Sequence, residues 1–321
     1  IFIGDDNMNN IRVVFMGTPE FSVPVLEGLI ANYNVVGVVT QPDKEVGRGR
    51  EIVFSPVKKV ALEHDIKVLQ PVKIRNDYSE VLELKPDLIV TCAYGQIIPK
   101  EMLDYPKYGC INIHASLLPK LRGGAPIHHA IIDGYDKTGV TIMYMVMKMD
   151  AGSIIAQESI PILESDNVGT LHDKLSVLGR DLMLKTLPNI ISGNINPIKQ
   201  NEDDVTYGFN IKPEEEKIDY SKNTRQIINQ IRGLNPFPGA YSLLEGRRVK
   251  MWNAKEGTHY TNEEIITGQV IYLYPDGIGI KTGNGEIIIT ELQLEGKRKM
   301  TATEFLNGVV NKELLIGRVF E

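Results

Sequence analysis

The sequence predicts an α/β protein with a parallel sheet in the first part of the chain and a small β-barrel in the last third. In the first part, short apolar strands alternate with amphipathic helical segments, which is typical of a parallel sheet buried on both faces. In the last third, short strands are separated by PDG and GNG turns, which is typical of hairpins. A chain of 321 residues, 42% of them hydrophobic, can bury two cores.

The first part opens with a βαβ unit. A strand at 11–16 (IRVVFM) runs through a glycine turn into a helical segment, and a second strand (VVGVVT) covers 35–40. The same alternation continues, with helical segments expected at 57–65 and 79–85 and strands at 67–70, 87–93 and 110–114. We expect residues 138–146 to form a strand that begins a longer excursion, and residues 170–192 to form an amphipathic helix.

A polar stretch separates the two parts. Residues 193–214 are rich in Asn, Pro and Lys, which indicates a linker. Beyond it we expect a short helix near 221–233, then strands at 247–254, 268–274, 277–282 and 286–293 and a helix at 301–307. The expected domains are therefore 8–195 for the α/β part, 196–214 for the linker and 215–321 for the barrel.

Composition excludes several classes of protein. A net charge of −6 argues against a surface built throughout for polyanions, although residues 215–321 carry 14 basic and 14 acidic residues and are compatible with an RNA-facing module. Cys92 and Cys110 are too few for a disulfide scaffold or a four-thiolate zinc site, so we expect buried thiols and no metal. No apolar run is long enough for a membrane span and the residues before Met8 match no targeting signal, so we expect a cytoplasmic protein.

The strand at 110–114 carries candidate catalytic groups. Side chains alternate along a strand, so Asn112 and His114 share one face while Ile111 and Ile113 point to the other. In open parallel sheets, ligands bind beyond the carboxyl ends of the strands, where this pair is expected to lie. The alternative is a pair of core polar groups whose hydrogen bonds are satisfied by the backbone.

Asp150 is a further candidate, in the turn MKMDAGSII after the strand at 138–146. An Asp before Ala-Gly is commonly only a turn residue. A carboxylate facing His114 would instead hold one tautomer of the imidazole and make it a usable acid or base. The spacing in the sequence does not show whether the two side chains meet.

Two loops decide between ligand classes. The first βα turn, GTPEF at 17–21, carries a single glycine and matches neither the dinucleotide fingerprint nor the P-loop, so we expect neither NAD nor ATP. The segment at 41–58 places Arg48 and Arg50 among glycines, which suits a flexible arm that meets phosphates. The alternative for that segment is an exposed, mobile loop with no ligand.

These residues bear a family resemblance. Asn112-x-His114, the SLLPxxRG loop at 116–123 and Asp150 together resemble the signature of the folate-dependent formyltransferases. Further stretches are similar to the methionyl-tRNA formyltransferase branch of that family: FMGTPEFSVPVL at 15–26, QPDKEVGRGR at 41–50, CAYGQIIP at 92–99, TGVTIM at 138–143 and RGLNPFPGAY at 232–241. The resemblance extends from residue 11 to the last strands.

The resemblance implies a fold and an activity. The fold is a Rossmann-like formyltransferase domain followed by a tRNA-binding barrel similar to an OB fold. The activity is transfer of the formyl group of 10-formyltetrahydrofolate, the co-substrate, to the α-amino group of methionyl initiator tRNA, for initiation of translation. The implied partner is this tRNA rather than DNA or a membrane, and we expect a monomer.

The resemblance also implies residue roles. The catalytic residues are Asn112, His114 and Asp150. The folate contacts come from two loops, with Tyr94, Gly95, Ile97 and Pro99 in one and Ser116, Leu117, Leu118 and Pro119 in the other. The tRNA contacts are Arg48 and Arg50. These roles suit acyl transfer, because an amine that attacks a formyl carbon creates an oxyanion that needs fixed hydrogen-bond donors, and a His-Asp pair can move the proton.

Two other functions remain open from the sequence. One changes the acceptor: a sugar-nucleotide N-formyltransferase, or a hydrolase that releases formate to water. The neutral barrel and the segment at 41–58 favour tRNA over a small sugar. The other is an RNA-binding module on an inactive scaffold, which the presence of Asn112, His114 and Asp150 in matching motifs argues against.

Overall fold

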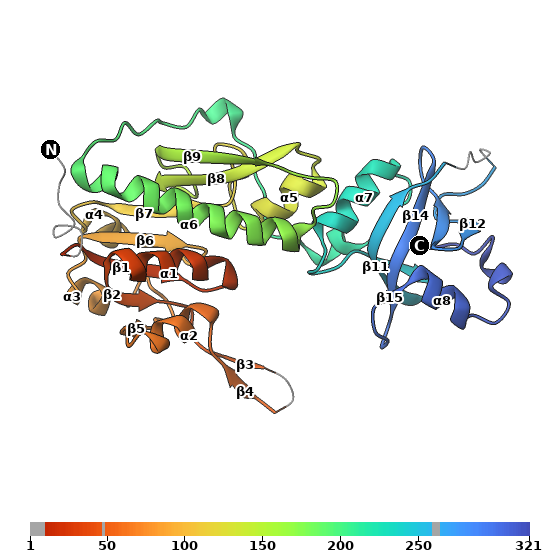
Figure 1. Ribbon diagram of the computed structural model, residues 1–321, viewed down its shortest axis with the longest axis horizontal. Coiled ribbons are helices and arrows are strands. Elements are labelled where there is room, and N and C mark those ends of the chain that lie inside the picture. The colour runs from red at the N-terminus through yellow and green to blue at the C-terminus, as the bar shows by residue number, and fades with distance from the viewer. Residues whose placement is uncertain (1–9, 47–48, 259–263) are drawn as a thin grey trace. The chain divides into compact units, whose positions relative to one another are not determined.

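The computed structural model describes residues 10–46, 49–258 and 264–321 (Figure 1). The chain divides into two compact units. The first comprises the residues up to Pro126 together with Lys137–Pro161 and His172–Phe209. The second comprises Ile127–Asp136, Ile162–Leu171 and Asn210–Glu321, so the chain passes between the units more than once.

The first unit is built on a seven-stranded sheet with the order β5-β2-β1-β6-β7-β8-β9. The pairs from β5 to β7 are parallel, and β8 and β9 continue the sheet antiparallel. The strands are β1 (Arg12–Gly17), β2 (Asn34–Val39), β5 (Val68–Leu69), β6 (Leu88–Cys92), β7 (Cys110–His114), β8 (Lys137–Tyr144) and β9 (Ile154–Pro161). The predicted α/β class with a largely parallel sheet is confirmed.

The strand predicted at 138–146 does not leave the sheet. It is β8, and it pairs with both β7 and β9. Residues 145–153 connect β8 to β9, and this connection is too short for the crossover of a dozen or more residues that a parallel pair requires. The two strands are therefore antiparallel. The expectation that residues 138–146 begin a longer excursion was wrong, because β8 and β9 both stay in the sheet.

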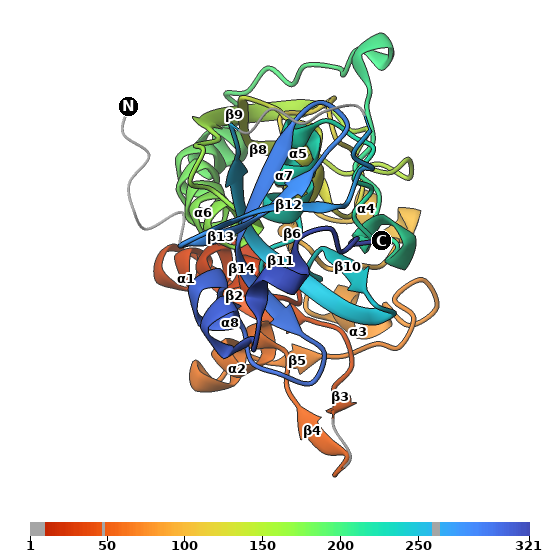
Figure 2. The same cartoon turned by 90° about the vertical axis from the view of Figure 1, so that its right-hand side faces the viewer.

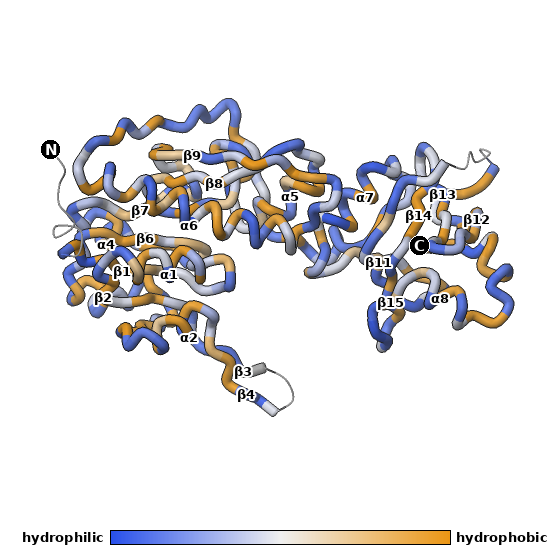
Figure 3. Tube along the Cα trace, in the orientation of Figure 1, coloured by the Kyte–Doolittle hydropathy of each residue, from blue (hydrophilic) through white to orange (hydrophobic). Residues whose placement is uncertain are grey.

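Helices cover both faces of the sheet (Figure 1). On one face α6 (Val168–Ser192) packs on β7 and β8, since a Cβ at Gly179 would lie 3.0 Å from Ile113. On the other face Val81 and Met102 pack in one cluster with Val14 and Ile89. Val81 belongs to α3 (Ser79–Glu83) and Met102 to α4 (Lys100–Asp104). The first unit also contains α1 (Val23–Asn32) and α2 (Pro56–Glu63). Hydrophobic and hydrophilic residues alternate along α6, as its amphipathic pattern predicts (Figure 3).

The segment at 41–58 contains a small hairpin. Its strands are β3 (Lys44–Val46) and β4 (Glu51–Val53), which pair antiparallel. Ile52 is 66% exposed, so the hairpin projects apolar as well as polar groups into solvent. Arg48, a predicted tRNA contact, lies outside the described residues.

The first half of the expected linker runs along the first unit. Residues 198–208, called the connecting segment below, form isolated bridges from Ile198 to Ile154 and from Tyr207 to Arg122. The amide of Gly208 donates to the carbonyl of Arg122 at 2.8 Å. The domain boundaries at 195 and 215 stay predictions, but the connecting segment lies in the first compact unit.

The second unit is a curled antiparallel sheet with the order β10-β11-β14-β13-β12, and β15 pairs with β14 (Figure 2). The strands are β10 (Tyr241–Leu244), β11 (Arg247–Glu256), β12 (Val270–Tyr274), β13 (Gly277–Lys281), β14 (Glu286–Leu294) and β15 (Met300–Thr301). Two of the last described residues bridge the two edges of the sheet: Phe320 pairs with Leu244 of β10, and Val319 pairs with Gln269, next to β12. These bridges satisfy edge groups and confirm the predicted barrel-like architecture.

Helix starts in the second unit are specified locally. Before α7 (Thr224–Gly233), the Asn223 side chain accepts from the amide of Gln226, and the Gln226 side chain reaches back, forming a capping box. Thr301 and Glu304 form the same arrangement before α8 (Ala302–Gly308). The remaining helix of the described chain is α5 (Pro126–Ile132). Within the described ranges, none of the helices has the length and apolar character needed to cross a membrane.

Candidate active site

His114 ends β7 at the carboxyl edge of the sheet and is 6% exposed. Its Nε2 lies 3.0 Å from the carbonyl of Leu121, and because a carbonyl can only accept, Nε2 carries the proton. Its Nδ1 lies 3.8 Å from Oδ1 of Asp150, within ion-pair distance but longer than a hydrogen bond. Nδ1 is therefore the nitrogen of this imidazole that can gain or lose a proton at the site.

Asn112 lies two residues before His114 on the same face of β7. Thr91, on the neighbouring strand β6, is its register partner. The Thr91 hydroxyl donates to Oδ1 of Asn112 at 2.8 Å. With its oxygen held in this way, the amide of Asn112 presents its NH2 group as a donor.

Asp150 reaches the site from the turn after β8. Its Oδ2 accepts the backbone N–H of Gly123 at 2.8 Å, and its Oδ1 faces His114. The residue has a φ of 47°, in the left-handed region that side chains rarely adopt. The structure thus brings together the three side chains predicted to be catalytic, from two segments of the chain.

The SLLP loop follows β7 and is held by its own hydrogen bonds. Ser116 is buried and its hydroxyl donates to the carbonyl of Lys120 at 2.6 Å. The amide of Leu118 donates to the hydroxyl of Thr141 on β8 at 3.1 Å, and the Leu118 side chain is buried. Leu117 and Pro119 are half-buried. Two of the four folate contacts predicted in this loop, Ser116 and Leu118, therefore use their side chains to shape it.

The second predicted folate loop follows β6. Tyr94 packs in the core beneath it, and its buried hydroxyl has no hydrogen-bond partner among the described residues. Burial raises the pKa of this phenol to about 12. Gly95 has a φ of 86°, Pro99 precedes α4, and Ile97 leaves 61% of its surface exposed. Because β6 and β7 are parallel neighbours, both loops leave the same edge of the sheet.

The remaining predicted residue, Arg50, lies in the hairpin turn, directly before β4. Its side chain is 82% exposed and pairs with Glu45 at 3.8 Å across the hairpin. An ion pair this exposed contributes little to stability. Arg50 is therefore available for a ligand from solvent.

Two residues to which the sequence analysis assigned no role are linked to Asp150, one directly and one through the other. Gln200, in the connecting segment, donates to the carbonyl of Asp150 at 2.8 Å. Arg122, within the SLLPxxRG motif, contacts Gln200 through its guanidinium. The motif marks Arg122 in the sequence, but Gln200 stands in a polar stretch that resembles a linker, and nothing local distinguishes it.

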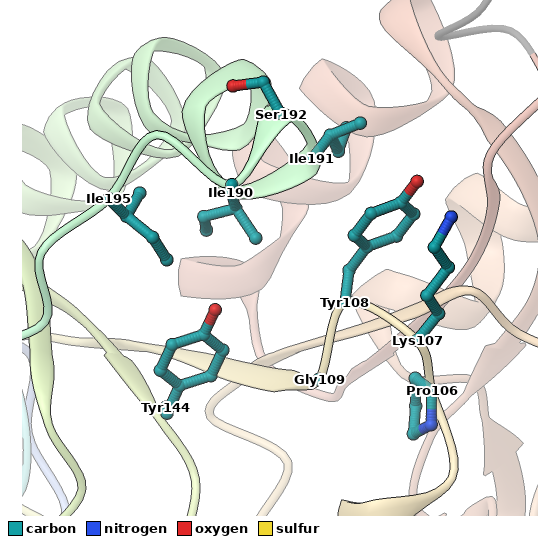
Figure 4. A pocket seen from close by; sticks show the side chains of 10 residues that line it. Pro106, Lys107, Tyr108, Gly109, Tyr144, Ile190, Ile191, Ser192 and Ile195 are labelled. Atoms are coloured by element: carbon teal, nitrogen blue, oxygen red, sulfur yellow. The ribbon is translucent and has the colours of Figure 1, made fainter.

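A cavity of about 490 Å³ lies elsewhere in the first unit (Figure 4). It is lined by the aromatic rings of Tyr108 and Tyr144 and by isoleucines of the α6 end, Ile190 and Ile191. Gly109 also lines it, immediately before β7 begins, so the cavity is at the opposite end of this strand from His114. It is not part of the candidate site.

The described residues offer neither a metal-binding cluster nor a reactive thiol at the site. Across the residues that the structure covers, no cluster of three His, Cys, Asp or Glu side chains is placed to hold a metal ion. Cys92 and Cys110 are free and buried, and burial raises the pKa of both thiols. A raised pKa leaves little thiolate, so neither cysteine is placed for nucleophilic chemistry.

Comparison with known proteins shows the family of the chain. Residues 10–187 match the model of the family described as formyl transferase, and residues 210–310 match its C-terminal domain. The chain belongs to the formyl transferase family. Its members include the methionyl-tRNA formyltransferase of Bacillus velezensis, 56% identical over 92% of this chain and 94% of that protein, and that of Bacillus subtilis, 55% identical over the same shares. The resemblance noted in the sequence is confirmed.

Two solved structures share the fold. A sugar 3N-formyl transferase, WlaRD, aligns with a TM-score of 0.64 at 22% identity, over 90% of this chain and 99% of that one. The methionyl-tRNA formyltransferase of Clostridium thermocellum aligns with a TM-score of 0.54 at 18% identity, over 77% and 94%. At these identities the likeness concerns the fold alone.

Proposed function

We propose that this protein transfers the formyl group of 10-formyltetrahydrofolate to the α-amino group of methionine on initiator tRNA, and so supplies formylated tRNA for the initiation of translation. It is a one-carbon group transferase. The observation that carries the proposal is the convergence of His114, Asp150 and Asn112 at the carboxyl edge of the sheet. That constellation suits acyl transfer to an amine, and methionyl-tRNA formyltransferases are relatives over nearly the whole chain.

Asn112 is proposed as the fixed donor to the oxyanion. Attack of an amine on a formyl carbon turns the carbonyl oxygen into an anion, and a donor that is already oriented stabilises that charge without reorganisation. Thr91 holds the amide oxygen of Asn112, so its NH2 group is oriented before substrate arrives. This pre-orientation is what the proposed role requires.

His114 is proposed to act through Nδ1 alone. Nε2 is committed to the carbonyl of Leu121, so the imidazole can donate to the oxyanion, or accept a proton, only at Nδ1. Asp150 faces this nitrogen at 3.8 Å, and its negative charge can stabilise the imidazolium that forms when Nδ1 takes up a proton in the reaction. The pair can therefore take the proton that the attacking amine loses and return one to the departing nitrogen of the folate, so that the new C–N bond forms first and the old one breaks when the oxyanion collapses.

The two loops at the sheet edge are proposed to hold the folate. The donor supplies the activated formyl group on a flat heterocyclic carrier. Ile97, exposed in the loop after β6, offers an apolar contact, and Gly95 keeps the backbone beside it accessible. The loop 116–119 is shaped by Ser116 and Leu118 and forms the other wall in this proposal.

The acceptor is proposed to be held by the hairpin and the barrel. Arg50 and Arg48 would bind phosphates of the tRNA, because one guanidinium group can donate two parallel hydrogen bonds to the oxygens of one phosphate. The barrel at 215–321 would bind the body of the tRNA. We further propose that the protein works in the cytoplasm as a monomer, on tRNA and not on DNA or a membrane.

Transfer of labelled formyl groups tests the proposal. Purified protein is incubated with formyl-labelled 10-formyltetrahydrofolate and with methionyl initiator tRNA, methionyl elongator tRNA, an amino-sugar nucleotide or buffer alone. We expect label in the initiator tRNA at a rate far above the other three. Label in the sugar would assign a sugar acceptor, free formate in buffer would assign a hydrolase, and no transfer to any acceptor would leave only an RNA-binding role.

A further inference from the structure

The backbone at Asp150 adopts a conformation that it does not favour by itself. Its φ of 47° lies in the left-handed region, which residues other than glycine adopt only occasionally, Asp and Asn among them. Two residues later, the chain passes so close to β8 that a Cβ at Gly152 would lie 1.6 Å from the carbonyl oxygen of Tyr144. Such a turn persists only where neighbouring groups hold it.

Gln200 holds this turn with both protons of its amide. Its Nε2 donates to the carbonyl of Asp150 and to the carbonyl of Gly152, each at 2.8 Å. The Gln200 side chain comes from the connecting segment, 50 positions away from Asp150, and the residue is 5% exposed. A buried amide that uses both donors on two carbonyls of one turn fixes the position of both.

Arg122 fixes Gln200 in turn. Its Nε and Nη2 donate to Oε1 of Gln200 at 3.1 and 2.8 Å, so the amide cannot flip without losing these bonds. Arg122 is fully buried, and its charge is met by Glu202 of the connecting segment, whose carboxylate accepts from Nη2 at 3.0 Å. Glu202 also accepts from Lys148, two residues before Asp150. These two cations hold the pKa of Glu202 at about 2.

The neighbour of Arg122 completes the arrangement. Gly123 donates its backbone N–H to Oδ2 of Asp150, so residues 122 and 123 act on the two ends of the same aspartate. The side chain of Arg122 acts on the Asp150 backbone through Gln200, and the backbone of Gly123 acts on the Asp150 carboxylate. One loop and the connecting segment thus determine where Oδ1 lies relative to His114.

We propose that Gln200 is a positioning residue for the reaction, which sets the Asp150 carboxylate against His114, and that Arg122 and Glu202 keep Gln200 in place. This inference rests on the proposed function, in which Asp150 and His114 move the proton. According to this inference, residues of the connecting segment affect the rate of the reaction, although the segment is not one of the loops that follow β6 and β7. Gln200 touches neither substrate in this proposal.

Gln200→Glu tests the proposal with a minimal change of shape. The variant keeps the acceptor for Arg122 but places a carboxylate oxygen against the carbonyls of Asp150 and Gly152, where a donor stood. For misplacement of a group by a fraction of an ångström we expect kcat to fall by about 10-fold or more, with KM for each substrate changed less than about 2-fold. Asp203→Ala, an exposed acid in the same segment, is the matched control and is expected to behave as wild type.

A double-mutant cycle separates positioning from general weakening. In an Asp150→Asn background the proton-transfer group is already lost, so adding Gln200→Glu is expected to lower kcat less than about 2-fold further. An equal loss of kcat in both backgrounds would show that Gln200 acts independently of Asp150 and would overturn the proposal. Unchanged kcat in the single variant would do the same.

A readout without substrate distinguishes this inference from the proposed function. The amide of Gly123 is bonded to Asp150, so its hydrogen-exchange protection reports whether the carboxylate is in place. We expect protection at Gly123 to fall in Gln200→Glu and to stay unchanged in Asp203→Ala. If Gln200→Glu does not fold, Gln200→Met and Glu202→Gln receive the same measurement, and full protection in the folded variants overturns the proposal. Wild-type protein that protects Gly123 but formylates nothing would count against the function alone.

Discussion

The backbone amide of Gly123 donates to Oδ2 of Asp150 at 2.8 Å, and this bond leaves Oδ1 of the same carboxylate facing His114. The two oxygens of Asp150 therefore have different tasks. One anchors the side chain to the loop after β7, and the other is the group that can attract a proton at Nδ1 of His114. This division makes the charge of Asp150, rather than its shape, the property on which turnover is expected to depend.

Asp150→Asn is expected to remove that charge while the loop keeps its shape. The amide oxygen can still accept from Gly123, but the side chain no longer carries the charge that faces Nδ1 of His114. We expect kcat to fall by about 10²-fold or more with little change in KM, as for loss of a group that acts in the transition state. Steady-state kinetics with both substrates check this, and a kcat within a few-fold of wild type would show that the carboxylate is dispensable.

Asn112→Ala and His114→Ala are expected to reduce turnover through loss of oxyanion donors. Because removal of one oxyanion donor typically lowers kcat by about 10²-fold or more, we expect a fall of that size in each variant, while both proteins stay folded. Circular dichroism and a thermal melt report folding, and single-turnover formyl transfer reports chemistry. Near-normal turnover in both variants would remove the mechanism.

Thr91→Val is expected to loosen Asn112 without touching substrate. Valine has nearly the shape of threonine, but it lacks the hydroxyl that donates to Oδ1 of Asn112. Because the amide is then free to turn, we expect a loss of about 10-fold in kcat, less than for removing the donor itself. Thr91→Ser retains the hydroxyl and serves as the control. Equal rates in the valine and serine variants would contradict the orienting role.

Arg48→Ala and Arg50→Ala are expected to act on the tRNA substrate. Loss of a phosphate contact should raise KM for charged tRNA several-fold at low salt, with a smaller effect at higher salt because fewer counterions are released on binding, and leave KM for the folate donor unchanged. Lys185→Ala removes one exposed charge from α6 and controls for net charge. An equal effect on both substrates would count against the hairpin as an RNA arm.

Glu202 is expected to make stability depend on pH in acid. Arg122 and Lys148 lower its pKa from an unfolded value near 4.5 to about 2. A lowered pKa in the folded state means that the unfolded state binds the proton more readily. The stabilisation is therefore complete above about pH 4.5 and is lost as the pH falls towards 2. Urea unfolding from pH 2 to 7 should show a smaller acid slope for Glu202→Gln, and identical slopes would contradict the pairing.

Elements missed in the sequence share a physical cause. The strand β9 (IIAQESIP) is an edge strand whose residues are half-buried or exposed without strict alternation, so it lacks the period of two that marks a strand with one buried face. The strands β3 and β4 stand away from any core, and the described residues of β4 are all exposed. A strand that does not pack against a core needs no alternation of apolar and polar residues, so its sequence lacks the pattern from which a strand is predicted.

By itself the sequence determined the α/β order, the extent of the long helix within two residues at its start, the common face of Asn112 and His114, and membership in the formyltransferases. These depend on periodicity and motifs, which neighbouring residues carry. Only the tertiary structure decided that Asp150 faces His114 through Oδ1, that Nε2 of His114 is committed to Leu121, and that Gln200 holds the Asp150 turn. Such contacts join residues 7 to 50 positions apart, and their geometry follows from how loops and packed segments meet.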